Sequence, residues 1–284
     1  MQPRAPFPSF DRLGPEHPAH PVILSVPHGG RAYPQSLLDN LRVPAGQLRA
    51  LEDRHIDGVA QAALGESIAI VARRPRAWID LNRPETDRDP LIDDGLSRHA
   101  TAQQSVKVRA GLGLVPRRVG GSGDLWQRRW PLGEIDARIR GDHRPYHQAI
   151  ASALDAAHRR FGIAVLLDLH SMPSLIGTAP AQIVIGDRYG RTAHPRFVAS
   201  IEAEIRAAGL RPALNAPYAG GHVLDRHAAP KAGIHAIQLE LDRALYLDAT
   251  HEECGPGFDA CAGLVRSIIA ALIDAACPGA IAAE

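Results

Sequence analysis

The sequence predicts an α/β protein with a mostly parallel or mixed central sheet and helices on both faces. Short apolar runs rich in β-branched residues alternate with longer segments of helical periodicity along the 284 residues, which is the pattern of βαβ units. Several of the short runs are apolar at consecutive positions, as is typical of strands covered on both faces. With 45% hydrophobic and 22% charged residues, the composition is that of a globular protein with a core.

The segments that carry the strand pattern are short and strongly apolar. We expect strands at Val22–Val26, Ile68–Val71, Trp78–Leu81, Ile163–Leu169, Gln182–Ile185 and Ala236–Leu241. The residues before Pro21 lack this pattern, so we expect them to form an irregular arm.

Helical periodicity is clearest in four longer segments. We expect helices at Ala45–Leu64, Tyr146–Phe161, Pro195–Ala208 and Gly257–Ala276. In the second and the last, apolar residues recur at spacings of three and four, which places them on one helix face. Such faces are typical of core packing, so we assign them no function.

The segment Pro84–Pro131 differs from the rest of the chain because it is polar, rich in Gly, Arg and Asp, and without continuous periodicity. Irregular segments of this length are uncommon and are often functional lids. We therefore predict one domain over residues 1–284, with a long polar insertion or lid at about 84–131.

Charge and hydropathy exclude two classes of partner. Lys and Arg number 32 against 31 Asp and Glu, so the formal net charge of +1 gives no basic field for a nucleic acid. No stretch approaches the ~18 uncharged apolar residues of a membrane span, and Met1–Arg12 lacks the apolar core of a signal peptide. We expect a soluble, cytoplasmic protein; the sequence leaves its oligomeric state open.

Two of the 14 histidines stand where a ligand would bind in an open α/β sheet, just beyond or at the ends of expected strands. His28 follows the first strand and precedes two glycines, which would let backbone approach a ligand closely. His170 follows Ile163–Leu169, and Asp168 two residues earlier could orient its imidazole. Each histidine alone could be a turn or core residue, but together they indicate a metal site.

A catalytic zinc site often combines two histidines with one carboxylate and leaves a fourth position open. The segment from Glu52 to Asp57 offers three acids on an expected helix. Asp53 and Asp57 are four residues apart and would share one face, whereas Glu52 would point elsewhere. We predict Asp53 as the third ligand and Asp57 as an outer partner, or else a solvated charged helix start.

Glu240 is the candidate general base, because it lies in the apolar strand Ala236–Leu241. A carboxylate among apolar residues is costly unless it is paired or used, and desolvation raises its pKa toward the range of a general base. The alternative is a buried salt bridge between Glu240 and Arg243.

Further polar residues could bind a substrate. Arg83 could bind an anionic group with two parallel hydrogen bonds and Asn82 could add another, unless Arg83 is a structural partner of Asp80. The Gly-rich loop from Asn215 to His222 could close on a ligand. We expect substrate contacts from Tyr218 and Arg243, and acid or transition-state-stabilising roles for His147 and His222.

In their order along the chain, these motifs resemble the N-formylglutamate amidohydrolase family. The matching pieces span Val22 to Asp248 and read SVPHGG, EDRHID, WIDLNRP, RPYH, LLDLHS, NAPYAGGH and QLELDRALYLD. The resemblance implies a zinc-dependent α/β hydrolase fold of the phosphorylase/hydrolase-like type, related to zinc carboxypeptidases and aspartoacylases. It also implies cleavage of N-formyl-L-glutamate to formate and L-glutamate, a late step of histidine degradation.

The resemblance also implies roles for individual residues. His28 and His170 match the metal histidines, Glu240 matches the catalytic glutamate, and Asn82 with Arg83 match the pair that holds substrate carboxylate in aspartoacylase-like relatives. One position departs from the pattern of zinc carboxypeptidases, which place an acidic ligand three residues after the first histidine, where this chain has Arg31. The carboxylate must therefore come from elsewhere in the chain, so the resemblance supports Asp53 less directly than it supports the two histidines.

We expect a single Zn²⁺ ion and a small anionic N-acyl amino acid as substrate. Imidazole and carboxylate ligands also accept nickel, iron or manganese. Two other functions remain open at this stage: a metal-dependent deacylase or peptidase for another N-acyl amino acid or cell-wall fragment, and a non-catalytic binder of zinc or a dicarboxylate.

Overall fold

The computed structural model describes residues 8–97, 104–120, 123–131 and 133–277. In this part of the chain seven strands form one sheet in the order β1-β3-β2-β4-β7-β5-β6. The strands are β1 (Phe10–Leu13), β2 (Val22–Val26), β3 (Ile68–Ala72), β4 (Ala164–Met172), β5 (Ile183–Gly186), β6 (Pro212–Leu214) and β7 (Ile234–Asp242). Four neighbouring pairs are parallel, while β1 runs antiparallel to β3 and β5 antiparallel to β7. The expected mixed sheet is confirmed.

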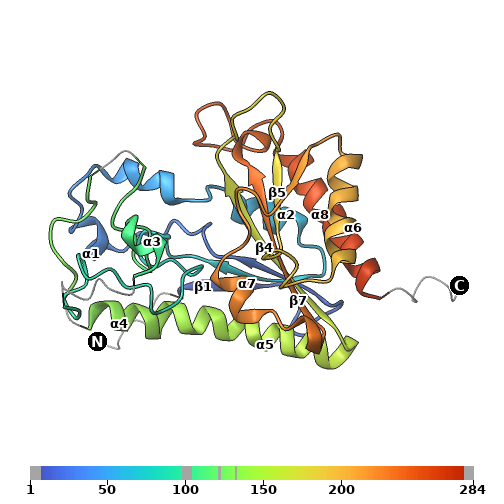
Figure 1. The fold of residues 1–284 in the computed structure, drawn as a ribbon, viewed down its shortest axis with the longest axis horizontal. Coiled ribbons are helices and arrows are strands. Elements are labelled where there is room, and N and C mark those ends of the chain that lie inside the picture. The colour runs from blue at the N-terminus through green and yellow to red at the C-terminus, as the bar shows by residue number, and fades with distance from the viewer. Residues whose placement is uncertain (1–7, 98–103, 121–122, 132, 278–284) are drawn as a thin grey trace, which may run out of the picture.

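Helices cover both faces of this sheet (Figure 1). They are α1 (Gln35–Leu38), α2 (Ile56–Ala63), α3 (Val106–Arg109), α4 (Glu134–Arg138), α5 (Arg144–Phe161), α6 (Pro195–Ala207), α7 (His222–His227) and α8 (Phe258–Ala276), with short 3-10 turns at Ala45–Leu51, Pro230–Ala232 and Arg243–Leu245 and a π-helical turn at Ile139–His143. Helices α2, α6 and α8 pack on one face and α5 and α7 on the other, each with its own hydrophobic cluster.

The polar segment at 84–131 contributes to the second of these clusters. Its described residues bury Ile92, Leu114, Val115, Val119, Leu125, Trp126 and Trp130. The guanidinium of Arg138 lies 3.8 Å from the centroid of the Trp130 ring, which adds a cation–π contact. The segment therefore packs its apolar residues into the core on this face of the sheet, and residues 98–103 and 121–122 lie outside the described part.

Three expected elements are wrong. Ala45–Leu64 is not one helix, because Glu52 is extended and His55, at φ 59°, takes a left-handed conformation just before α2. Trp78–Leu81 is not a strand, because the Trp78 amide donates to Pro75 O and closes a turn. The arm before Pro21 contains β1, which pairs with β3.

Strands β4 and β7 extend further than the sequence predicts, to Met172 and Asp242. His170 and Glu240 therefore lie inside neighbouring parallel strands, opposite each other in register. The sheet brings the carboxyl ends of β2, β4 and β7 together, and the polar residues predicted at strand ends gather there. Across the described residues, we find no helix with the length and hydropathy of a membrane span.

Candidate active site

His28, Asp53 and His170 converge at the carboxyl edge of the sheet. The two imidazole rings lie 4.8 Å apart between centroids, because β2 and β4 are parallel neighbours. Asp53 Oδ2 lies 3.1 Å from His170 Nδ1 and 3.5 Å from His28 Nδ1. The Asp53 amide donates to His28 O at 3.0 Å, which holds the two residues side by side. One ligand atom from each of the three residues lies within 4.8 Å of the others.

Each imidazole is oriented by a second carboxylate. His28 Nε2 lies 2.7 Å from Asp80 Oδ1, and His170 Nε2 lies 2.9 Å from Asp168 Oδ2. A carboxylate accepts, so Nε2 of each ring donates to its carboxylate and Nδ1 faces Asp53. This is the pattern of metal-bound histidines, whose other nitrogen donates to a carboxylate or carbonyl. The predicted role of Asp168 in orienting His170 is confirmed.

The electrostatics of this cluster favour a cation. Burial alone would raise the pKa of Asp53, but the neighbouring imidazoles of His170 and His28 hold that pKa well below its usual range. Burial would lower the pKa of His170, but Asp168 and Asp53 raise it well above its usual value. His28 Nδ1 is buried without a hydrogen-bond partner among the described residues. Two imidazoles and one carboxylate in anionic surroundings fit the ligand preference of Zn²⁺.

The other two acids of the segment point elsewhere. Asp57 accepts two hydrogen bonds from Arg31, at 2.8 and 2.7 Å, so the expectation that it supports the metal ligands is wrong. Glu52 accepts from Tyr33 and from Arg54. The physical reason is the break before α2, which leaves Asp53 in the turn that contacts His28 instead of on a helix face shared with Asp57.

Glu240 faces the same cluster and is almost completely buried. Burial raises its pKa to about 8, although the charge of His170 acts in the opposite direction. Gln238 Nε2 donates to Glu240 Oε1 at 2.7 Å. Arg243 contacts Ser171, the Glu52 carbonyl and Asp53, so among the described residues the alternative salt bridge to Glu240 does not form.

A cavity of about 400 Å³ opens in front of these residues. Eight of the predicted site residues line it: His28, Asp53, Asn82, Arg83, His170, Tyr218, Glu240 and Arg243. The lining residues that were not predicted include Arg76, Lys107, Arg188 and Gln238. The cavity wall is rich in cations, which suits an anionic ligand.

Asn82 and Arg83 enter the cavity from a loop rather than from a strand end. Asn82 Nδ2 lies 3.3 Å from His170 Nε2 and 3.4 Å from Gln238 Oε1. Arg83 Nε donates to Leu112 O and lies 3.9 Å from Asp80 Oδ2, whereas Arg76 Nε donates to the same oxygen at 2.8 Å. Arg76 is therefore the main partner of Asp80, and Arg83 lacks a close carboxylate partner among the residues the structure describes.

Lys107 lies on α3, within the polar segment, and lines the cavity. Partial burial and the charges of Arg83 and Arg76 lower the pKa of its ammonium group. Within the described ranges this ammonium has neither an ion pair nor a hydrogen bond. Sequence reasoning missed Lys107 because its segment has no periodicity from which to infer which side chains point inward.

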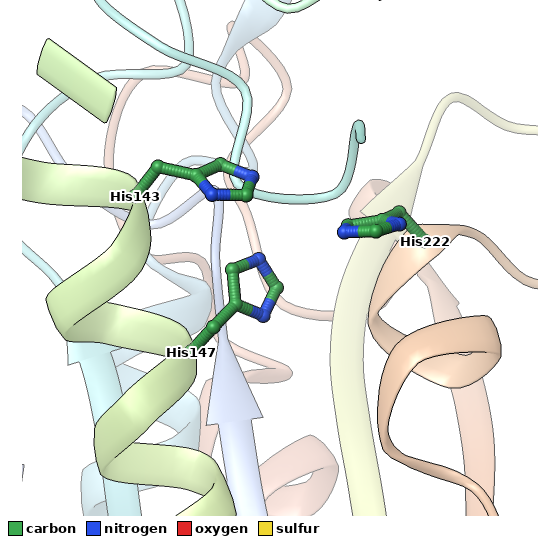
Figure 2. Close-up of side chains that lie close together, drawn as sticks. All are labelled: His143, His147 and His222. Atoms are coloured by element: carbon green, nitrogen blue, oxygen red, sulfur yellow. The ribbon is translucent and has the colours of Figure 1, made fainter. Parts of the chain in front are cut away.

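His147 and His222, predicted as catalytic candidates, do not line this cavity. They form a second group with His143, shown in Figure 2, which borders the loop carrying Asn82. Burial lowers the pKa of His147 and of His143, and it lowers the pKa of His222 to about 4. The rings are therefore neutral near pH 7, and their contacts are with protein groups behind the cavity wall.

The fold and the site together define an α/β protein with a candidate metal site. His28, Asp53 and His170 form this site, and Glu240 lies beside it in a cavity lined by several cations. Residues 20–247 match the sequence profile of the N-formylglutamate amidohydrolase family. The chain therefore belongs to this family, which confirms the resemblance.

Individual relatives agree with this assignment. An N-formylglutamate deformylase of Pseudomonas putida is 29% identical over 239 residues, covering 81% of this chain and 83% of that protein. One of Pseudomonas aeruginosa is 30% identical, covering 80% and 82%. The crystal structure of an N-formylglutamate amidohydrolase from Ralstonia eutropha JMP134 has a TM-score of 0.85 at 30% identity, covering 95% of this chain and 98% of that one. A gene product of Agrobacterium tumefaciens, at 20% identity and a TM-score of 0.63, shares the fold.

Proposed function

We propose that this protein is a metal-dependent amidohydrolase that cleaves N-formyl-L-glutamate to formate and L-glutamate. The observation that carries the proposal is the cluster of His28, Asp53 and His170 beside Glu240, at the base of a cavity whose wall is cationic. The names of the relatives, N-formylglutamate deformylase and N-formylglutamate amidohydrolase, support the same substrate.

His28 Nδ1, His170 Nδ1 and Asp53 Oδ2 would hold the ion, which we propose is Zn²⁺. When bound there, a divalent ion supplies a Lewis acid that polarises a carbonyl and makes water more acidic. Asp80 and Asp168 fix the two imidazoles so that their Nδ1 lone pairs face one point.

Glu240 would act as the general base and then as the acid. Its carboxylate takes a proton from the attacking water as oxygen adds to the formyl carbon. It returns that proton to the amide nitrogen as the C–N bond breaks, so that formate and the amine of glutamate leave. Gln238 orients the carboxylate by donating to its Oε1 at 2.7 Å.

The cations of the wall would bind the two carboxylates of the substrate. Arg83 and Lys107 suit this role best, because neither has a close carboxylate partner in the described part of the structure. Asn82 and Tyr218 would add hydrogen bonds, and Arg243 lies beside Asp53 at the same wall. Two cations facing one cavity repel each other, and an anion between them removes that cost.

We also propose that the protein acts in the cytoplasm in histidine degradation. We further propose one hydrolase domain over the whole chain, with the 84–131 segment covering the cavity. The domain proposal is supported by Lys107, which brings the segment into the cavity wall.

The test is metal analysis of the purified protein combined with an assay of formate release. We expect about one zinc per chain, and loss of formate release after chelation that added zinc restores. A panel of N-formyl, N-acetyl and dipeptide substrates separates the alternatives. Faster turnover of another N-acyl amino acid would favour a different deacylase, and tight binding of zinc and glutamate without turnover would favour a non-catalytic binder.

A further inference from the structure

His143 and His147 contact the backbone on both sides of Asn82. His143 Nε2 lies 2.9 Å from Arg83 O, and His147 Nε2 lies 2.9 Å from Leu81 O. A carbonyl oxygen only accepts, so both Nε2 atoms carry a proton and donate it. The two histidines are four residues apart at the junction of the π-helical turn and α5, and both are fully buried.

Asn82 itself is held from two other directions. The backbone N–H of Val223, at the start of α7, donates to Asn82 Oδ1 at 2.9 Å. The backbone N–H of Asn82 donates to Asp80 Oδ1 at 2.9 Å. The Asn82 side chain packs directly against the backbone of Gly221, because a Cβ added to Gly221 would lie 2.4 Å from Asn82 Oδ1. The backbone of three successive residues, Leu81 to Arg83, is therefore fixed from behind the cavity wall.

His227, His147 and the Leu81 carbonyl form a series of hydrogen bonds in which each group donates to the next. His147 Nδ1 lies 2.9 Å from His227 Nε2. Because His147 Nε2 carries the proton of its neutral ring, its Nδ1 accepts from His227 Nε2–H. Burial lowers the pKa of His147, which keeps the ring neutral and the direction of the chain defined.

The same group could be considered a metal site, since His143, His147 and His222 offer atoms within 4.8 Å of one another (Figure 2). The hydrogen bonds argue against this. Both nitrogens of His147 are engaged, and only His143 Nδ1 and His222 Nε2 are buried without a hydrogen-bond partner among the described residues of this group. Two available lone pairs are fewer than the three or four protein ligands of a typical zinc site.

We infer that His143 and His147 are positioning residues that hold Leu81–Arg83 in the conformation that presents Asn82 and Arg83 to a substrate carboxylate. The inference rests on the proposed function for the identity of that substrate. It assigns the two histidines a role in binding rather than in proton transfer, because neither touches the cavity.

The test compares His147→Phe, which keeps the ring volume and removes the donor, with His147→Gln, which keeps a donor. We expect His147→Phe to raise KM for N-formyl-L-glutamate by about tenfold, the effect of one lost hydrogen bond, while kcat changes less than about threefold. His147→Gln should recover most of that loss. The control is His158→Gln on the same helix α5, which should leave both constants unchanged.

Binding of L-glutamate to the metal-loaded protein, measured by calorimetry, gives a second readout that needs no turnover. If the wild type binds glutamate but releases no formate, the proposed function fails while the positioning role is still tested by affinity. A loss of kcat at constant KM in His147→Phe would overturn the inference in favour of proton transfer. A second equivalent of bound metal that disappears in the variants would overturn it in favour of a metal site. Should His147→Phe not fold, His143→Phe and His143→Gln provide the same comparison at Arg83 O.

Discussion

His170 and Glu240 stand opposite each other in the register of the parallel strands β4 and β7. Because side chains at paired positions of neighbouring strands point to the same face, an imidazole and a carboxylate share one edge of the cavity. The distance between the proposed metal ligand and the proposed base is thus set by the backbone pairing of β4 and β7.

Replacing Glu240 by Gln should reduce kcat by roughly 10²–10⁴, the usual contribution of a general acid–base group, while metal content stays the same. The amide keeps the size of the side chain but cannot accept the proton of water. Glu52→Gln is the matched control, because Glu52 is also buried but does not line the cavity. Wild-type turnover in Glu240→Gln would show that the residue is structural.

Asp168→Asn should weaken metal affinity by about 10- to 100-fold, because it removes the charge that orients and polarises His170. Competition with a zinc chelator measures the change. Asp57→Asn serves for comparison, since the carboxylate of Asp57 pairs with Arg31 away from the cluster. Equal losses in the two variants would contradict the outer role of Asp168.

Lys107→Met should raise KM for N-formyl-L-glutamate and have little effect on N-formyl-L-glutamine, which lacks the second negative charge. Removing a charged hydrogen bond of about 1.5–3 kcal/mol corresponds to roughly a 10- to 100-fold change in kcat/KM. Lys107→Arg keeps the charge and should retain the preference for the acidic substrate. A similar loss on both substrates would show that Lys107 does not discriminate between them.

The protein should lose stability on acidification between about pH 6.5 and pH 4. Burial lowers the pKa of His227 from its ordinary value of 6.5 to about 4, so in this range the unfolded chain binds more protons than the folded one. The stability contributed by the neutral ring is present above pH 6.5 and is lost as the pH falls toward 4. Melting temperatures of the wild type and His227→Gln across this range check the prediction, and the variant should show the shallower decline.

Much of the sheet is predictable from the chain because β2, β3, β4, β5 and β7 are almost entirely buried and contain several consecutive apolar residues. The edge strands β1 and β6 lack such an apolar run, so the sequence does not predict them. Strand β1 carries Asp11 and Arg12, and β6 has three residues and begins with Pro212. The run at Trp78–Leu81 is apolar enough for a strand, but it has no sheet neighbour and folds as a turn.

For the site, the residues at strand ends were the predictable part. His28 lies just after β2, and His170 and Glu240 lie near the carboxyl ends of β4 and β7, where polar residues follow the apolar part of each strand. Asp80, Arg76 and Lys107 depend on contacts between segments far apart in the chain, which periodicity does not encode. His147 and His222, predicted as catalytic candidates, are not among the residues that line this cavity, and their catalytic roles stay a prediction.

The position of Asp80 between His28 and Asn82 links the proposed metal site to the proposed substrate site. Its Oδ1 accepts from His28 Nε2 at 2.7 Å and from the backbone N–H of Asn82 at 2.9 Å, so one carboxylate contacts both of these cavity-lining residues. Under the proposed function, a metal ion bound at His28 and a dicarboxylate bound at Asn82 would each lie next to a residue that Asp80 contacts. By thermodynamic linkage, the factor by which either ligand changes the affinity of the other must be the same in both directions. Under the proposed function, metal binding and substrate binding would therefore be coupled equilibria.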